Sequence, residues 1–183
     1  MSAHERTRPV ASVVGSARDG SPSEPAAEAL GRALIDAGCR VVTGGLGGVM
    51  RAASRGARSS TSYRPGDIIG VLPGYVAADA NEFVDVPICS GLHHARNVIV
   101  AATGDVLFAV GGRAGTLSEM ALAWTLGKPV IAICSEGWAG ELSGRPIDDR
   151  RDDKVYGPYD DAAEAVGLAI EVLRTHQFRP RDF

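Results

Sequence analysis

The sequence predicts an α/β protein of the Rossmann-like class, in which a parallel sheet is flanked by helices on both faces. Short apolar segments rich in β-branched residues alternate along the chain with longer alanine-rich segments, which is typical of repeated βαβ units. The apolar segments show little polar alternation, as expected of strands buried on both faces. Two of these segments run directly into glycine-rich turns that precede a predicted helix.

Six segments have the composition and length of buried strands. They are Val10–Val14, Val41–Thr43, Asp67–Leu72, Phe83–Ile88, Asp105–Val110 and Val130–Cys134. The first, second and fifth are followed by glycine, and the third is followed by Pro73 and Gly74. Glycine and proline at these places end a strand in a turn.

Five segments between or after the strands have the composition of helices. They are Ser23–Ala37, Val49–Arg58, Leu92–Ala102, Thr116–Leu126 and Asp160–Thr175. In the first, Ser23 is placed to cap the helix, Pro25 suits its first turn, and Gly38 follows its end. Right-handed crossovers would distribute these helices over the two faces of the sheet.

We expect one domain over residues 1–183, a length that can bury a sizeable core. Residues 1–8 are predicted to be a flexible N-terminal tail, and residues 178–183 a C-terminal tail. Residues 135–159 are rich in Gly, Asp and Arg and show no periodicity. They are therefore predicted to form a long surface loop.

The composition excludes several classes of partner. A formal net charge of −3 provides no basic field to attract nucleic acid or an anionic membrane. The three cysteines, Cys39, Cys89 and Cys134, are odd in number and far apart, which is typical of reduced thiols. The first residues lack the apolar core of a signal peptide, and the apolar runs are too short to span a bilayer. We therefore expect a cytoplasmic protein.

Both glycine-rich turns follow the carboxyl end of a predicted strand, where open parallel sheets bind their ligands. Glycine allows close backbone approach, and the free N–H groups of the next helix attract an anion. The residues concerned are Gly44, Gly45, Gly47, Gly48, Gly111, Gly112, Gly115 and Thr116. Neither turn is a G-x-G-x-x-G or a P-loop, so we expect a phosphate-bearing ligand held in another way. The alternative is that these glycines only make tight turns.

Two charged residues have both a structural and a functional interpretation. Thr116-Leu117-Ser118-Glu119 has the form of a capping box, in which Glu119 would accept a hydrogen bond from the Thr116 N–H. Alternatively, the Glu119 carboxylate could stabilise an oxocarbenium ion or activate water; the spacing alone favours the cap. Arg96 is either a solvated helix residue or a bidentate clamp for phosphate.

A metal site is not expected. Cys89, His93 and His94 lie close in the sequence, but adjacent histidines point in different directions on a helix. No second acid or thiol cluster completes a ligand set.

Residues 110–119, Val-Gly-Gly-Arg-Ala-Gly-Thr-Leu-Ser-Glu, resemble the P-G-G-x-G-T-x-x-E motif of the Lonely-Guy family, long mislabelled "lysine decarboxylase". Gly15-Ser16, Thr43-Gly44-Gly45 to Met50, and Arg96-Asn97 follow in the family's order, so the resemblance spans residues 10–134. It implies a homodimer or homotetramer with further ligand contacts from Gly15, Ser16, Asn97 and Arg113. In the hydrolase branch it implies cleavage of a nucleoside 5′-monophosphate to free base and ribose 5-phosphate, without a cofactor. Arg96 and Glu119 match the catalytic pair.

The chain also departs from the hydrolase pattern. The family's leading proline is Val110 here, and its Arg-Lys pair is Arg96-Asn97. Arg-Asn together with Gly-Gly-x-x-Gly-Thr-Leu-Ser-Glu looks closer to a sister branch that includes molybdenum-cofactor carrier proteins. The main hypothesis is a phosphoribohydrolase; the alternative is a non-catalytic carrier or binder of molybdenum cofactor or another phosphate-bearing ligand. A lysine decarboxylase is excluded because neither Lys128 nor Lys154 suits a pyridoxal Schiff base.

Overall fold

The computed structural model of the chain describes residues 8–175 and contains a seven-stranded sheet in the order β4-β3-β2-β1-β5-β6-β7. All neighbouring strands are parallel. The strands are β1 (Val10–Gly15), β2 (Arg40–Thr43), β3 (Ile68–Leu72), β4 (Val86–Cys89), β5 (Val106–Val110), β6 (Val130–Ile133) and β7 (Tyr156–Tyr159). The predicted α/β class with a parallel sheet is confirmed.

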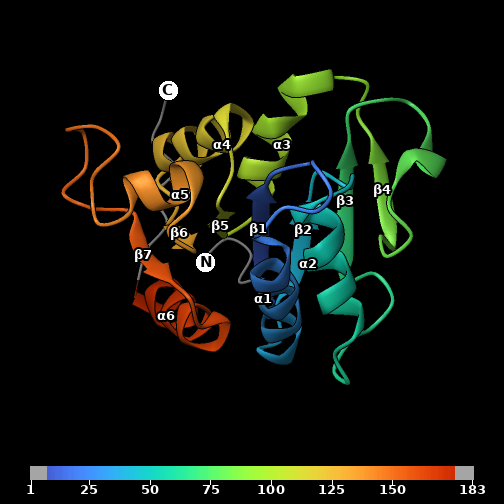
Figure 1. Cartoon of the computed structure of the whole chain (residues 1–183), viewed down its shortest axis with the longest axis horizontal. Coiled ribbons are helices and arrows are strands. Elements are labelled where there is room, and N and C mark those ends of the chain that lie inside the picture. The colour runs from blue at the N-terminus through green and yellow to red at the C-terminus, as the bar shows by residue number, and fades with distance from the viewer. Residues whose placement is uncertain (1–7, 176–183) are drawn as a thin grey trace, which may run out of the picture.

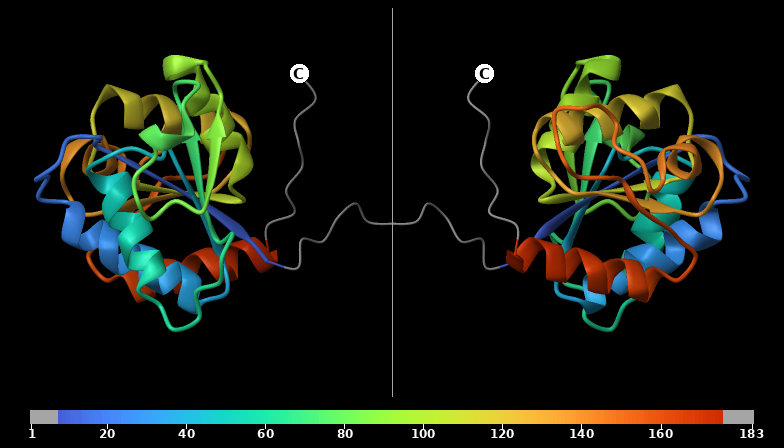
Figure 2. Two further views of the ribbon diagram at one scale, coloured as in Figure 1. Left: turned by 90° about the vertical axis from the view of Figure 1, so that its right-hand side faces the viewer. Right: turned by 90° about the vertical axis from the view of Figure 1, so that its left-hand side faces the viewer.

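Helices cover both faces of this sheet. They are α1 (Glu24–Asp36), α2 (Val49–Arg58), α3 (Arg96–Thr103), α4 (Ala114–Thr125), α5 (Gly137–Leu142) and α6 (Ala162–Thr175), with short 3-10 helices η1 (Ala77–Asp79) and η2 (His93–Ala95). Figure 1 shows the order of the elements, and Figure 2 shows α1, α2 and α6 on one side of the sheet and α3 and α4 on the other. Of the described helices, none is long and apolar enough to cross a membrane.

The strands alternate their side chains between two apolar clusters, which explains their lack of polar positions. Val13 of β1 packs with α1, α2 and α6, whereas Val14 packs with α3, α4 and α5. All five residues of β5 are buried. The core therefore fixes the register of β1 and β5, in which Gly15 lies opposite Val110 at the carboxyl edge.

The start of α1 differs from its prediction. Ser23 occupies the N-cap position, but its side chain makes no capping hydrogen bond. Its hydroxyl lies 3.1 Å from Glu136 Oε2 instead. Pro25 does lie in the first turn, and Gly38 follows the last turn with a φ of +81°.

The prediction of a surface loop over residues 135–159 is corrected, because this segment contains α5 and β7. The irregular part is limited to residues 135–136 and 143–155. The six-residue α5 is too short to show a helical period, and β7 is an edge strand that contains Gly157 and Pro158. Edge strands tolerate such residues, so neither element has the apolar pattern of the buried strands.

The predicted tails fall mostly outside the described residues. Residues 1–7 and 178–183 are not among them, whereas Arg8 is. Its guanidinium lies 2.6 Å and 3.0 Å from the two carboxylate oxygens of Asp67, so Arg8 is fixed to the body of the protein.

Candidate functional site

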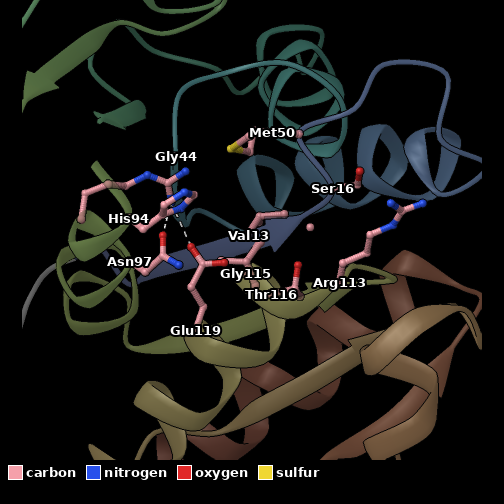
Figure 3. A pocket seen from close by; sticks show the side chains of 14 residues that line it. Val13, Ser16, Gly44, Met50, His94, Asn97, Arg113, Gly115, Thr116 and Glu119 are labelled. Carbon is pink, nitrogen blue, oxygen red and sulfur yellow. Dashed lines mark hydrogen bonds and ion pairs between the residues drawn. The ribbon is translucent and has the colours of Figure 1, made fainter. Parts of the chain in front are cut away.

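A cavity of about 210 Å³ lies at the carboxyl ends of β1 and β5. From β1 the chain builds the sheet outward through β2, β3 and β4, and then returns to β5 on the other side of β1. Ligands bind in the crevice at such a switch point. Figure 3 shows the lining side chains, which are Val13, Val14, Gly15, Ser16, Ala17, Gly44, Met50, His94, Arg96, Asn97, Arg113, Gly115, Thr116 and Glu119.

The structure brings most of the predicted site residues together. Those that line the cavity are Gly15, Ser16, Gly44, Arg96, Asn97, Arg113, Gly115, Thr116 and Glu119. The predicted residues that do not line it are Gly45, Gly47, Gly48, Gly111 and Gly112. Sequence reasoning missed Met50 and His94 as lining residues. His94 stands two positions before Arg96, and because residues two apart do not share a helix face, this spacing gave no signal.

The turn between β2 and α2 supports the cavity from behind. The Gly48 N–H donates to Asp19 Oδ1 at 2.7 Å, and the Val49 N–H donates to the Ser16 carbonyl at 2.9 Å. A Cβ at Gly48 would lie 2.3 Å from the Ser16 carbonyl oxygen. These glycines therefore hold the loop that carries Ser16, and of this turn only Gly44 reaches the cavity.

The turn between β5 and α4 is fixed by α5. Gly111 and Gly112 have φ values of +57° and +92°, a region that favours glycine. Their carbonyl oxygens accept hydrogen bonds from the N–H groups of Ala139 and Trp138, at 3.1 Å and 3.2 Å. The segment that was predicted as a loop thus holds the glycine turn in place.

The N-terminus of α4 faces the cavity and is suited to an anion. The first hydrogen bond within α4 runs from the Leu117 N–H to the Arg113 carbonyl, so the N–H groups of residues 114–116 have no partner in the helix. No side chain caps this end. The Thr116 hydroxyl lies at the same place, and Figure 3 shows Arg113 and Ser16 facing each other beside it. Free N–H groups, the helix dipole and a guanidinium together form an anion cradle.

The predicted capping box is wrong. The helix begins at Ala114, so Thr116 lies inside the first turn and Glu119 lies in the second. A capping box requires the carboxylate three residues after the N-cap. Instead, Glu119 Oε1 accepts a hydrogen bond from Arg96 Nη1 at 3.0 Å.

Arg96 and Glu119 form a buried ion pair across the cavity, with side chains that are 13% and 6% exposed. Burial raises the pKa of the Glu119 carboxyl to about 7, although the charge and hydrogen bond of Arg96 act to lower it. Gly44 leaves room for this arrangement, because a Cβ there would lie 2.4 Å from Arg96 Nη2. The pair provides a weakly acidic proton and a cation at one end of the cavity.

Asn97 connects this pair to α4. Its Oδ1 accepts from Arg96 Nη1 at 2.8 Å, and its Nδ2 donates to Ser118 Oγ at 2.9 Å. Ser118 in turn donates to the Gly115 carbonyl at 2.6 Å. Because both polar atoms of Asn97 are engaged, this residue positions Arg96 and the start of α4. Within residues 8–175, no group of three or more His, Cys, Asp or Glu side chains could hold a metal ion.

The fold and the site define a Rossmann-like α/β protein with an anion cradle at the switch point of its sheet. The chain belongs to the SLOG cluster4 family, whose model matches residues 8–156. This confirms the predicted relation to the Lonely-Guy-like superfamily and to its molybdenum-cofactor-carrier-like branch.

Two solved structures are similar over nearly the whole chain. The molybdenum cofactor binding protein of Rippkaea orientalis has 30% sequence identity and a TM-score of 0.78. The match covers 93% of this chain and 99% of that protein's chain. The molybdenum cofactor carrier protein of Chlamydomonas reinhardtii has 30% identity and a TM-score of 0.72, and covers 92% of this chain and 100% of its own.

Other similar proteins add less about function. An uncharacterized protein of Archaeoglobus fulgidus is 38% identical over 104 residues, which span 57% of this chain and 66% of that protein. DNA processing protein A of Streptococcus pneumoniae has 20% identity and a TM-score of 0.58, and this likeness concerns the fold alone.

Proposed function

We propose that this protein is a non-catalytic binder or carrier of molybdenum cofactor, a phosphate-bearing pterin. The observation that carries the proposal is the anion cradle at the N-terminus of α4, which opens into a cavity lined at its other end by polar side chains. The similarity to two proteins named for binding or carrying this cofactor supports the choice of ligand. Here the cofactor is cargo and takes part in no reaction.

The cradle suits the phosphate end of such a ligand. The N–H groups of Gly115 and Thr116 and the Thr116 hydroxyl are neutral donors, and Arg113 adds a positive charge. Charge-assisted hydrogen bonds to phosphate are about twice as strong as neutral ones. These donors hold a phosphate group without reacting with it.

The other end of the cavity is better suited to holding the ligand than to catalysing a reaction on it. Arg96 and Glu119 are bonded to each other, and Arg96 is held a second time by Asn97. A ligand that used either group as a catalyst would have to displace this buried pair. A buried pair held in this way serves well as a rigid wall, and Arg96 Nε, which is buried and has no partner among the described residues, is left to bond a ligand.

The experiment is anaerobic transfer of the cofactor. Cofactor released from a molybdoenzyme is mixed with the purified protein and passed through gel filtration. Molybdenum is measured by mass spectrometry, and pterin by fluorescence after oxidation. We expect both to elute with the protein in about equal amounts, and to be absent from a Gly115→Asp variant, whose carboxylate occupies the cradle. Elution of both without the protein would reject the proposal.

Hydrolysis of a nucleoside 5′-monophosphate is the second candidate, and one observation favours it. A carboxyl group with a pKa of about 7 beside a guanidinium is suited to general acid catalysis near neutral pH. Incubation with AMP and chromatography of the free base tests it against a Glu119→Gln variant. Base release by the native protein alone supports hydrolysis; equal release by both excludes it.

A homodimer or homotetramer is also proposed. Four exposed apolar side chains, Val86, Ile88, Leu92 and Val98, lie on β4, before η2 and on α3. Exposed apolar side chains that gather on one face often mark a protein interface. We infer that this part of the surface is where the copies meet.

A further inference from the structure

The cavity has two chemically different ends. Figure 3 shows Ser16, Arg113 and Thr116 toward one side, and Gly44, Met50 and His94 toward the other. The first end is the anion cradle. The second has a bare backbone at Gly44, the thioether of the buried Met50, and the imidazole of the exposed His94. Arg96 and Glu119 also line this end, so it suits a flat group whose edge carries polar atoms.

Among the described residues of this end, Arg96 Nε is buried without a hydrogen-bond partner, whereas His94 is exposed and is therefore the side chain that a ligand reaches first. Asn97 uses both of its polar atoms within the protein, and Arg96 Nη1 bonds to Asn97 and Glu119. In the described part of the chain, by contrast, no hydrogen bond or ion pair engages the His94 imidazole. An exposed imidazole on a cavity wall can stack on a heterocycle and exchange hydrogen bonds with its edge.

The backbone places His94 firmly at this position. The η2 helix leads directly into α3, where Arg96 is anchored by its ion pair. The N–H of His93 donates to the Pro73 carbonyl at 3.0 Å, and the N–H of Ala95 donates to the Leu92 carbonyl at 2.9 Å. His93 itself does not line the cavity, so only one of the two adjacent histidines can meet the ligand.

We propose that His94 recognises the flat heterocycle of the ligand, while the start of α4 holds its phosphate. This inference rests on the proposed function and adds the residue that selects the ring. It assigns ring selectivity to a side chain outside the glycine turns and outside the Arg96–Glu119 pair. The pyrimidinone edge of a pterin is also the edge of guanine, so a guanine nucleotide is a usable probe.

The experiment compares ribose 5-phosphate with GMP, because the two differ only by the guanine ring. Dissociation constants are measured by calorimetry for the native protein, for His94→Ala and for the matched control His93→Asn. Asparagine is chosen because His93 has a φ of +48°, which asparagine tolerates. The His94→Ala variant loses a stacking contact and should therefore bind GMP about 5- to 30-fold more weakly than the native protein. Ribose 5-phosphate binding should change less than about twofold, and His93→Asn should bind both ligands as the native protein does.

Each other outcome overturns a defined part of the argument. If His94→Ala binds GMP normally, or loses both ligands equally, His94 does not select the ring. If the native protein binds ribose 5-phosphate and GMP equally, the ring end is unused and this inference fails while the cradle stands. If the native protein binds neither, the cradle and the proposed function fail as well. Equal melting temperatures establish that the variants are folded.

Discussion

Gly115 offers the sharpest test of the anion cradle. A Cβ added there would meet no heavy atom within 4 Å, so a larger side chain fits without moving the backbone. Replacing Gly115 with Asp puts a carboxylate among the free N–H groups of α4. A negative charge at a helix N-terminus is favourable, so the variant should fold normally while its own side chain occupies the site.

The size of the effect follows from charge repulsion. Two unit negative charges about 5 Å apart repel by about 3 kcal/mol at an effective dielectric constant of about 20. Because Gly115 is exposed, screening by water reduces this to roughly 1.5–3 kcal/mol, which weakens phosphate binding about 10- to 100-fold. Gly115→Ala adds no charge and should bind phosphate within about threefold of the native protein, with a helix more stable by about 0.5 kcal/mol.

Calorimetric titration with inorganic phosphate and ribose 5-phosphate measures the dissociation constants. The fluorescence of Trp138 gives a second signal, because the backbone N–H of Trp138 donates to the Gly112 carbonyl beside the cradle. Gly167→Asp is the matched control. It adds the same charge to an exposed glycine of α6, where an added Cβ also meets no atom within 4 Å. Native-like phosphate binding by Gly115→Asp would refute the cradle. So would an equal loss in Gly167→Asp, because the effect would then be one of net charge.

Three further predictions concern the rest of the site and the surface. The raised pKa of Glu119 means that the folded state holds this proton more tightly than the unfolded state, so the Glu119 contribution to stability is fully present below about pH 4.5 and is lost as the pH rises to about 7. Urea unfolding at pH 5 and 8 should show this loss, up to about 3 kcal/mol, in the native protein relative to Glu119→Gln; parallel pH curves would contradict it. Gly44→Ala should displace Arg96 and lower the free energy of unfolding by about 1–2 kcal/mol. It should also weaken GMP binding more than ribose 5-phosphate binding. Unchanged binding constants in calorimetry and an unchanged free energy in urea unfolding would contradict the clash. Val98→Asp should lower the molar mass measured by light scattering to that of a monomer, and an unchanged mass would show that Val98 lies outside the interface.

The buried part of the fold could be predicted from the sequence, because a strand covered on both faces must be apolar throughout. β5 shows this most clearly, with five buried apolar residues in a row. The edge strand β7 escaped prediction for the complementary reason. Its Tyr156–Tyr159 segment faces less of the core and contains Gly157 and Pro158, so it lacks the apolar run by which a buried strand is found.

Some contacts of the site could not be predicted from nearby sequence. The glycine turns were found from their sequence, and Arg96 and Glu119 were paired through the family resemblance, but the direct ion pair between them was not predicted. The choice between a cap and an ion pair depended on whether α4 begins at Thr116 or at Ala114, a difference of two residues. That start is set by the hydrogen bonds of α5 to Gly111 and Gly112, which come from a segment with no helical signal of its own.

The two ends of the cavity also differ in the atoms that line them, backbone at one end and side chains at the other. This difference affects how the ligand is selected. The cradle consists mostly of backbone, with N–H groups of α4 held by a glycine turn and by α5. Such donors accept any phosphate and carry little information about the rest of the ligand. The ring end consists of side chains from α2, η2 and α3, among them Met50, His94 and Arg96. Substitutions of Met50 or His94 can change the ring that is accepted without disturbing the cradle, because the Arg96–Glu119 pair and Asn97 fix α3 against α4 independently of any ligand. Under the proposed function, the choice of ligand, and between carriage and hydrolysis, therefore rests on Met50, on a few side chains of η2 and α3, and on Glu119.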